Sequence, residues 1–184
     1  MELLDALAQT FDHAAKVVAG VRPEQLDHRT PCRDWDVRAL VTHMMGVVMN
    51  MGLGATGAEL VADLNTVPLD ADVGAQFRVE ADRTLFAWTA HGLEGEVNVG
   101  AGPMPAQVGI GINLLDTATH SWDIARGTGQ DANLPDEVAA AALAACRGIV
   151  TDDIRKFAGF DPAVPVTRDA NPTDQLVAFL GRRP

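Results

Sequence analysis

The chain has 184 residues, a length that suits one domain built around a single hydrophobic core. Hydrophobic residues make up 47% and charged residues 21% of the sequence, as in ordinary soluble globular proteins. A formal net charge of −11 makes nucleic acids and anionic lipid surfaces poor partners, because a polyanion repels them. No apolar run is expected to serve as a membrane helix, and the N-terminus is acidic rather than signal-like, so we expect a cytoplasmic protein.

Prolines divide the sequence into long windows without proline, and these windows have the apolar spacing of amphipathic helices. The first predicted helix has an apolar face over residues 3–18 and ends at Gly20. The second begins near Trp35, with Asp34 as its N-cap. The third is predicted over residues 73–91.

A short alternating stretch in residues 92–105, broken by glycines and prolines, predicts a hairpin or an irregular loop before the fourth helix. The fourth helix is predicted over residues 106–126, the fifth from Pro135 to about Gly159, and a short amphipathic piece over residues 173–180. No predicted strand alternates with these helices, which argues against a parallel α/β sheet. The sequence therefore predicts an all-α helical bundle in a single domain over residues 1–184.

A polar stripe lies on the fourth predicted helix, whose other residues are mostly apolar or small. Asp116 and His120 are one helical turn apart and stack on one face, and Asn113 and Asp123 extend the stripe. A helix that is apolar nearly all round is buried, and a buried carboxylate needs a partner, for which a metal ion is a common choice. For this pair alone, a simple Asp–His hydrogen bond along the helix is an equally good explanation.

A third ligand would favour the metal ion, and His43 is the best candidate. It lies in the middle of the second helix, at the edge of the apolar face, where a satisfied core-edge histidine is the alternative. The remaining histidines lie off the face of their helix, in a loop or at a helix end. Together, His43, Asp116 and His120 would form a three-ligand site that leaves coordination positions open for water or substrate.

Other residues near this stripe have structural explanations. Trp35 and Trp122 are expected to pack in the core near the site, each with its indole N–H seeking an acceptor. Asp123 is expected to accept one of those hydrogen bonds, or to pair with Arg38 or Arg126, rather than to bind the metal.

Cys32 and Cys146 are the only cysteines, and they form no CxxC pattern. We expect Cys32 to be a buried loop residue rather than a nucleophile, because Arg33 is its only basic neighbour. Counted along a helix, Cys32 would lie roughly 16 Å from His43, and Cys146 would lie outside the four-helix core. Neither cysteine is expected to supply a thiolate at the site.

Three segments resemble a known family. Residues 30–43, TPCRDWDVRALVTH, are similar to the second-helix motif of the mycothiol-dependent maleylpyruvate isomerase N-terminal domain family, within the wider DinB-like metal-binding bundles. Residues 116–129 contain HSWDIAR, which matches the H-x-W-D-[LI]-A-R signature of that family. The ending, DQLVAFLGRRP at residues 174–184, resembles the closing motif of its stand-alone members, of actinobacterial type.

The resemblance implies an up-and-down four-helix bundle with an additional C-terminal helix, which binds Zn²⁺ or, as alternatives, nickel or iron. In the family the ligands are a histidine on the second helix and a [DE]-x-x-x-H pair on the fourth, which fall on His43, Asp116 and His120. Asp116 stands where the isomerase has Glu. The resemblance also implies a low-molecular-weight thiol such as mycothiol as cosubstrate. The isomerase carries a further C-terminal domain that this sequence lacks, so isomerisation of maleylpyruvate is not expected.

Three functions stay open on the sequence alone. The first is a metal-dependent thiol S-transferase or isomerase, in which the metal stabilises the thiolate of a small thiol that attacks a small electrophile. The second is a non-catalytic metal- or ligand-binding protein of the stress response, and the third is a structural protein without metal. The partners expected are a small-molecule thiol and an electrophile, with neither nucleic acid nor membrane, and the chain is expected to be a monomer or a homodimer.

Overall fold

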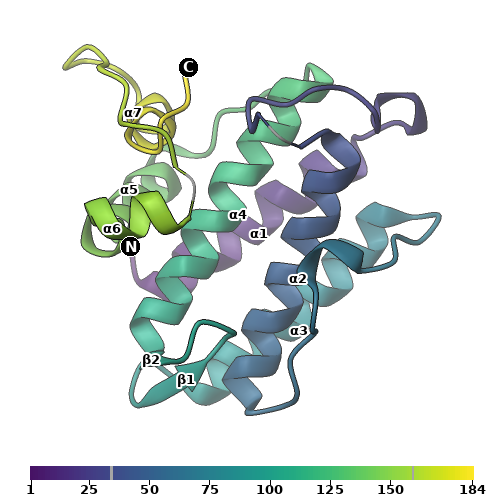
Figure 1. Cartoon of the computed structure of the whole chain (residues 1–184), viewed down its shortest axis with the longest axis vertical. Helices are drawn as coiled ribbons and strands as arrows, with labels where there is room; N and C mark the ends of the chain where they lie inside the picture. Colours follow the sequence, from purple (N-terminus) through teal and green to yellow (C-terminus); the bar gives the residue numbers. More distant parts are fainter. Residues whose placement is uncertain (34, 159) are drawn as a thin grey trace.

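A computed structural model describes residues 1–33, 35–158 and 160–184. Within these residues the chain is mostly helical, which confirms the predicted all-α fold (Figure 1). The long helices are α1 (Leu3–Ala19), α2 (Val37–Thr56), α3 (Val73–His91) and α4 (Ala106–Thr128). Shorter elements are η1 (Pro23–Gln25), η2 (Leu64–Thr66), β1 (Glu96–Asn98), β2 (Pro103–Pro105), α5 (Asp136–Ile149), α6 (Asp152–Phe157) and α7 (Pro172–Phe179).

The four long helices form one bundle around a continuous apolar core. α1 packs mainly against α3 and α4, and α2 packs mainly against the same two helices, so α1 and α2 lie on opposite corners. α5 packs on α4, and α7 packs on α5 (Figure 1). α5 therefore lies beside α4, the helix that carries the predicted polar stripe, and α7 lies on α5.

Most predicted boundaries agree with the structure, and the hairpin expected in residues 92–105 is the antiparallel pair β1 and β2. The start of the second helix differs, because α2 begins at Val37 rather than near Trp35. Its N-cap is Asp36, whose side chain accepts a hydrogen bond of 2.8 Å from the backbone N–H of Ala39. Asp34, the predicted N-cap, lies outside the described residues.

The prediction of one fifth helix from Pro135 to about Gly159 is wrong, because this segment forms α5 and α6. Val150 leaves the helical conformation with ψ at 81°. Thr151 then starts α6 by accepting a hydrogen bond of 3.3 Å from the backbone N–H of Ile154. Gly159, the predicted end, lies outside the described residues.

α2 is long and apolar enough, by length and composition, to cross a membrane, contrary to the expectation that no segment would be. However, 67% of its most apolar window is buried inside the bundle. Burial against α3 and α4 explains this composition, because a core helix needs an apolar surface on most of its sides.

Gly46 allows η2 to lie close against α2. A Cβ atom at this position would collide with the backbone of Leu64, meeting its Cα at 2.8 Å. The close approach places Asn65 of η2 beside α2, where its Oδ1 lies 3.1 Å from Nδ1 of His43. The absence of a side chain at Gly46 therefore helps to build the surroundings of a predicted ligand.

We expect Gly46→Ala to lower the free energy of unfolding by about 1–3 kcal/mol, because backbone has to move to admit the methyl group. Gly148→Ala in α5 is the matched control, since a Cβ there meets no atom within 4 Å. That change should be neutral or slightly stabilising, through helix propensity alone. Urea denaturation of both variants measures the difference, and equal stabilities would show that η2 can move freely.

Candidate metal centre

The three predicted ligands lie together where α2 packs against α4. His43 comes from the middle of α2, and Asp116 and His120 come from α4. One ligand atom from each residue can be chosen so that all three lie within 4.8 Å of one another. Nε2 of His43 is 3.7 Å, and Nε2 of His120 is 3.5 Å, from the same Oδ1 of Asp116.

This spacing fits one small divalent ion. Donor atoms held at about 2.1 Å from a tetrahedral zinc ion lie about 3.4 Å apart. Among the described residues, Oδ2 of Asp116 is buried without a hydrogen-bond partner. Such an oxygen is costly to bury, and a bound cation would compensate its charge. Two imidazoles and one carboxylate would hold the ion and leave a coordination position open.

The electrostatics of the site also favour a cation. Burial by itself would raise the pKa of Asp116, but His120 and His43, with Arg182 further away, outweigh burial and hold this pKa below its ordinary value. Burial by itself would lower the pKa of His43, but the hydrogen bond and negative charge of Asp116, helped by Asn65, outweigh burial and raise it. Asp116 is therefore a carboxylate at neutral pH, as a metal ligand must be.

Each histidine ring is held by a partner at its Nδ1 atom. Oδ1 of Asn65 lies 3.1 Å from Nδ1 of His43, and Oδ2 of Asp123 lies 3.2 Å from Nδ1 of His120. Both partners favour the tautomer with the proton on Nδ1, which turns the free electron pair of Nε2 toward Asp116. The sequence analysis missed Asn65, since it lies 22 residues beyond His43 in a different element and no spacing rule links the two.

Trp35 lies near the site, as predicted, and its ring contacts both histidines. Its ring centroid lies 4.2 Å from that of His43 and 5.9 Å from that of His120. The two imidazoles are 5.5 Å apart and nearly perpendicular. An indole over both rings restricts their rotation and excludes water from one side. Trp122 is buried too, with the guanidinium of Arg126 over its ring.

Asp123 does not have the partners expected from the sequence. It is completely buried and binds Nδ1 of His120 and the guanidinium of Arg182, whose Nη2 lies 2.9 Å from Oδ2. Arg126 instead lies over Trp122, and Arg38 lies near Asp27. Pairing with Arg38 or Arg126 was wrong because Arg182 of the C-terminal segment takes the place of these arginines at Asp123.

Cys32 lies beside the site, which corrects its expected distance. The backbone N–H of Trp35 donates to the carbonyl of Cys32 at 3.0 Å, which is the hydrogen bond of a turn, and α2 itself begins only at Val37. Ligand atoms of Cys32, His120 and Asp123 therefore fall within 4.8 Å of one another. This second group is a poor cation site, because the guanidinium of Arg182 already neutralises Asp123 and would repel a divalent ion.

Cys146 is buried on α5, and burial raises the pKa of its thiol to about 12. Its thiol is therefore protonated at any physiological pH and cannot act as a nucleophile. This agrees with the expectation that Cys146 supplies no thiolate.

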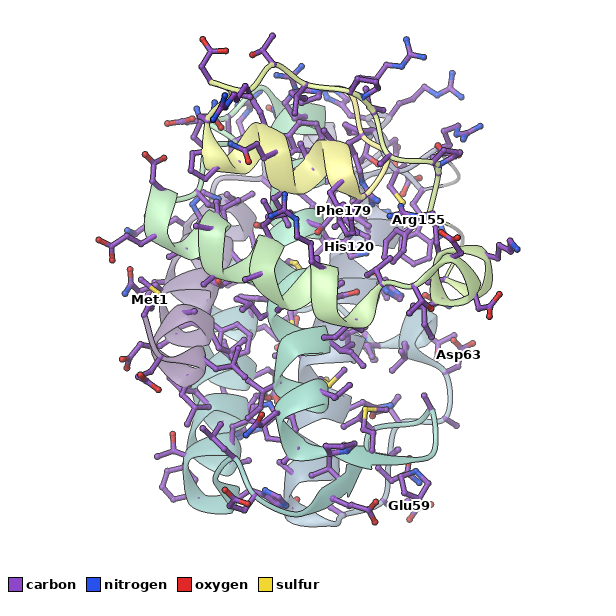
Figure 2. All side chains as sticks on the ribbon, turned by 90° about the vertical axis from the view of Figure 1, so that its left-hand side faces the viewer. Met1, Glu59, Asp63, His120, Arg155 and Phe179 are labelled. Atoms are coloured by element: carbon purple, nitrogen blue, oxygen red, sulfur yellow. The ribbon has the colours of Figure 1, made fainter. Side chains whose placement is uncertain are left out.

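A cavity of about 680 Å³ opens onto the predicted ligands. One wall is the loop before α2, which contributes Pro31, Cys32, Arg33 and Trp35. The opposite wall is the C-terminal segment, which contributes Ala158, Phe160, Asp161, Leu180, Gly181 and Arg182. Figure 2 shows His120 behind the C-terminal helices, in the region of Phe179 and Arg155. The cavity has the size of an ordinary small-molecule site.

The affinity for a divalent ion is expected to fall as the pH falls, because protons compete for His43. The pKa of His43 is raised, and a protonated imidazole cannot bind a metal. The apparent affinity should level off above this raised pKa and fall about tenfold per pH unit below it, for one displaced proton. Calorimetric titrations between about pH 6 and about pH 8 measure this, and an affinity independent of pH would contradict it.

His43 and Asp116 also make the folding stability of the ion-free protein depend on pH, in opposite directions. The contribution of His43, whose pKa is raised on folding, is fully present below its unfolded pKa and is lost as the pH rises through the folded value. The contribution of Asp116, whose pKa is lowered, is present above its unfolded pKa and is lost as the pH falls through the folded value. Ion binding and ion-free stability thus respond oppositely to the deprotonation of His43.

Comparisons with known proteins identify the family of this chain. A family model described as the mycothiol maleylpyruvate isomerase N-terminal domain matches residues 7–125, which include all three predicted ligands. Two relatives from Mycobacterium tuberculosis, strains CDC 1551/Oshkosh and ATCC 25618/H37Rv, are 33% identical over 190 residues, or 99% of this chain and 98% of theirs. Both are described as uncharacterized proteins. No solved structure matches the chain. The chain belongs to the mycothiol maleylpyruvate isomerase N-terminal domain family.

Proposed function

We propose that the protein is a metal-dependent thiol S-transferase or isomerase, which uses a diffusible low-molecular-weight thiol, such as mycothiol, on small electrophiles in the cytoplasm. The observation that carries the proposal is the open triad: two Nε2 atoms face one carboxylate oxygen, beside a cavity of about 680 Å³. Zinc is our first choice of ion, because two imidazoles and a carboxylate suit it, and nickel and iron are alternatives.

In this proposal, His43, Asp116 and His120 hold the ion, which would lower the pKa of a coordinated thiol so that its thiolate exists at neutral pH. Asn65 and Asp123 orient the two imidazoles through Nδ1. The aromatic rings of Trp35 and Phe160 line the cavity, where they exclude water and offer an apolar surface to the electrophile. The new bond forms between the sulfur and the electrophilic carbon, and a leaving group such as a halide departs with the bonding electrons.

A binding protein without turnover is the second candidate function. Among the described residues that line the cavity, the charged side chains outside the triad are paired. Arg33 pairs with Asp161, and Arg182 pairs with Asp123. No carboxylate or imidazole is then left over as a general base for a substrate that needs one. A protein that sequesters a metal ion or a ligand would have no need of such a group.

Conjugation of a thiol to a halogenated nitrobenzene separates the two functions. The protein loaded with Zn²⁺ is assayed with several low-molecular-weight thiols, and the conjugate is followed by absorbance. The control is the same protein stripped by a chelator and then reloaded. An S-transferase requires both the ion and a thiol. Stoichiometric ion binding with no acceleration by any thiol would favour the binding protein, and absence of ion binding would reject the metal-dependent enzyme and the sequestration of a metal ion.

A further inference from the structure

Arg182 is an unusual residue for the end of a chain, because its side chain is almost fully buried. Only 9% of Arg182 is exposed, whereas Arg183 beside it is exposed. Its Nη1 donates to the carbonyl oxygen of Leu180 at 3.0 Å, and its guanidinium lies over the ring of Phe160. The guanidinium is therefore fixed in one orientation, which exposed arginines are not.

The fixed guanidinium is joined to the candidate metal centre through a single residue. Nη2 and Nε of Arg182 lie 2.9 and 3.4 Å from the two oxygens of Asp123. Oδ2 of Asp123 in turn lies 3.2 Å from Nδ1 of His120, whose Nε2 faces Asp116. Asp123 is 0% exposed, so its carboxylate needs a buried partner to hold it in place, and Arg182 supplies one.

We propose that Arg182 is a positioning residue of the metal centre, which holds the carboxylate of Asp123 in place so that His120 presents Nε2 to the ion. It lies outside residues 7–125, which the family model matches, in the C-terminal segment that forms one side of the cavity. The proposal rests on the proposed function as far as the metal centre is concerned.

The first test compares Arg182→Gln with Arg183→Gln, two adjacent arginines of which only one is buried. Loss of a group that orients a metal-bound histidine typically weakens metal binding about 10–100-fold, so we expect this loss for Zn²⁺ in R182Q and none in R183Q. R182K should fall between R182Q and the wild type, since an ammonium supplies the charge without the fork of donors. Equal affinities of R182Q and R183Q would overturn the proposal.

The second test needs no ion. In ¹⁵N-histidine NMR of the ion-free protein, His120 should be the Nδ1–H tautomer in the wild type and in R183Q. In R182Q it should become a mixture, whereas a merely structural arginine would change melting temperature alone. A wild type that binds no ion but loses this tautomer in R182Q would reject the proposed function and keep the role of Arg182. Unchanged His120 signals in a folded R182Q would reject that role.

A third variant covers the case in which R182Q does not fold, because Asp123 would be left as an unpaired buried charge. Asp123→Asn removes that charge and keeps the shape of the side chain. Since Arg182 acts through Asp123, the double variant D123N/R182Q should bind Zn²⁺ no more than about twofold more weakly than D123N alone. A further loss comparable to that of R182Q alone would show that Arg182 acts by another route.

Discussion

His43→Ala and His120→Ala should each abolish stoichiometric binding of a divalent ion. Both Nε2 atoms lie within 3.7 Å of the same oxygen of Asp116, so each variant leaves only two ligands. The binding free energy of a tightly held zinc ion is roughly 10 kcal/mol or more. If each of three ligands supplies a third of it, the loss of one ligand weakens the affinity on the order of 100-fold or more. Competition against a chromophoric chelator measures the loss, and elemental analysis measures the ion that remains after purification.

His28→Ala is the matched control for these two variants. His28 is exposed, and its Nδ1 lies 3.2 Å from the carbonyl oxygen of Gly127, away from the cavity. It should bind one ion per chain like the wild type, and circular dichroism should show the same helix content in all three variants. An ion that remains stoichiometric in both H43A and H120A would show that the triad is held together only by Asp–His hydrogen bonds.

The sequence predicted the parts of this site that depend on spacing within one helix. Asp116 and His120 are stacked by the helical repeat, and His43 stands at the edge of the apolar face of α2. The three side chains come together because α2 packs beside α4. The amphipathic windows indicated a bundle but did not specify which helices are neighbours. The positions of helices α1 to α4 followed from prolines and apolar periodicity for the same local reason.

The parts that the sequence did not predict depend on contacts between distant segments. Asp123 and Arg182 are 59 residues apart, and their pairing depends on where the C-terminal segment packs in the folded chain. The position of Cys32 depends on a reversal of the loop before α2, which a distance counted along a helix cannot describe. Neither feature leaves a periodic pattern in the sequence.

Turnover should depend on an added low-molecular-weight thiol and should survive loss of both cysteines. Cys146 cannot contribute, because burial raises its pKa to about 12. Cys32 is the serious competitor, since its sulfur lies within 4.8 Å of a ligand atom of His120. A protein cysteine that attacks a halogenated nitrobenzene becomes a stable thioether, however, and can react only once. Repeated turnover therefore needs a thiol that leaves with the product.

The variants Cys32→Ser, Cys146→Ser and the double variant are assayed with and without thiol, under conditions of many turnovers per chain. With thiol, we expect all three to keep the wild-type rate within about twofold, because serine preserves the size of each side chain. Without thiol, the wild type should give at most one modified residue per chain, which mass spectrometry would locate at Cys32. Sustained turnover without thiol, or complete loss of turnover with thiol in C32S while C146S is unaffected, would show that the proposed mechanism is wrong.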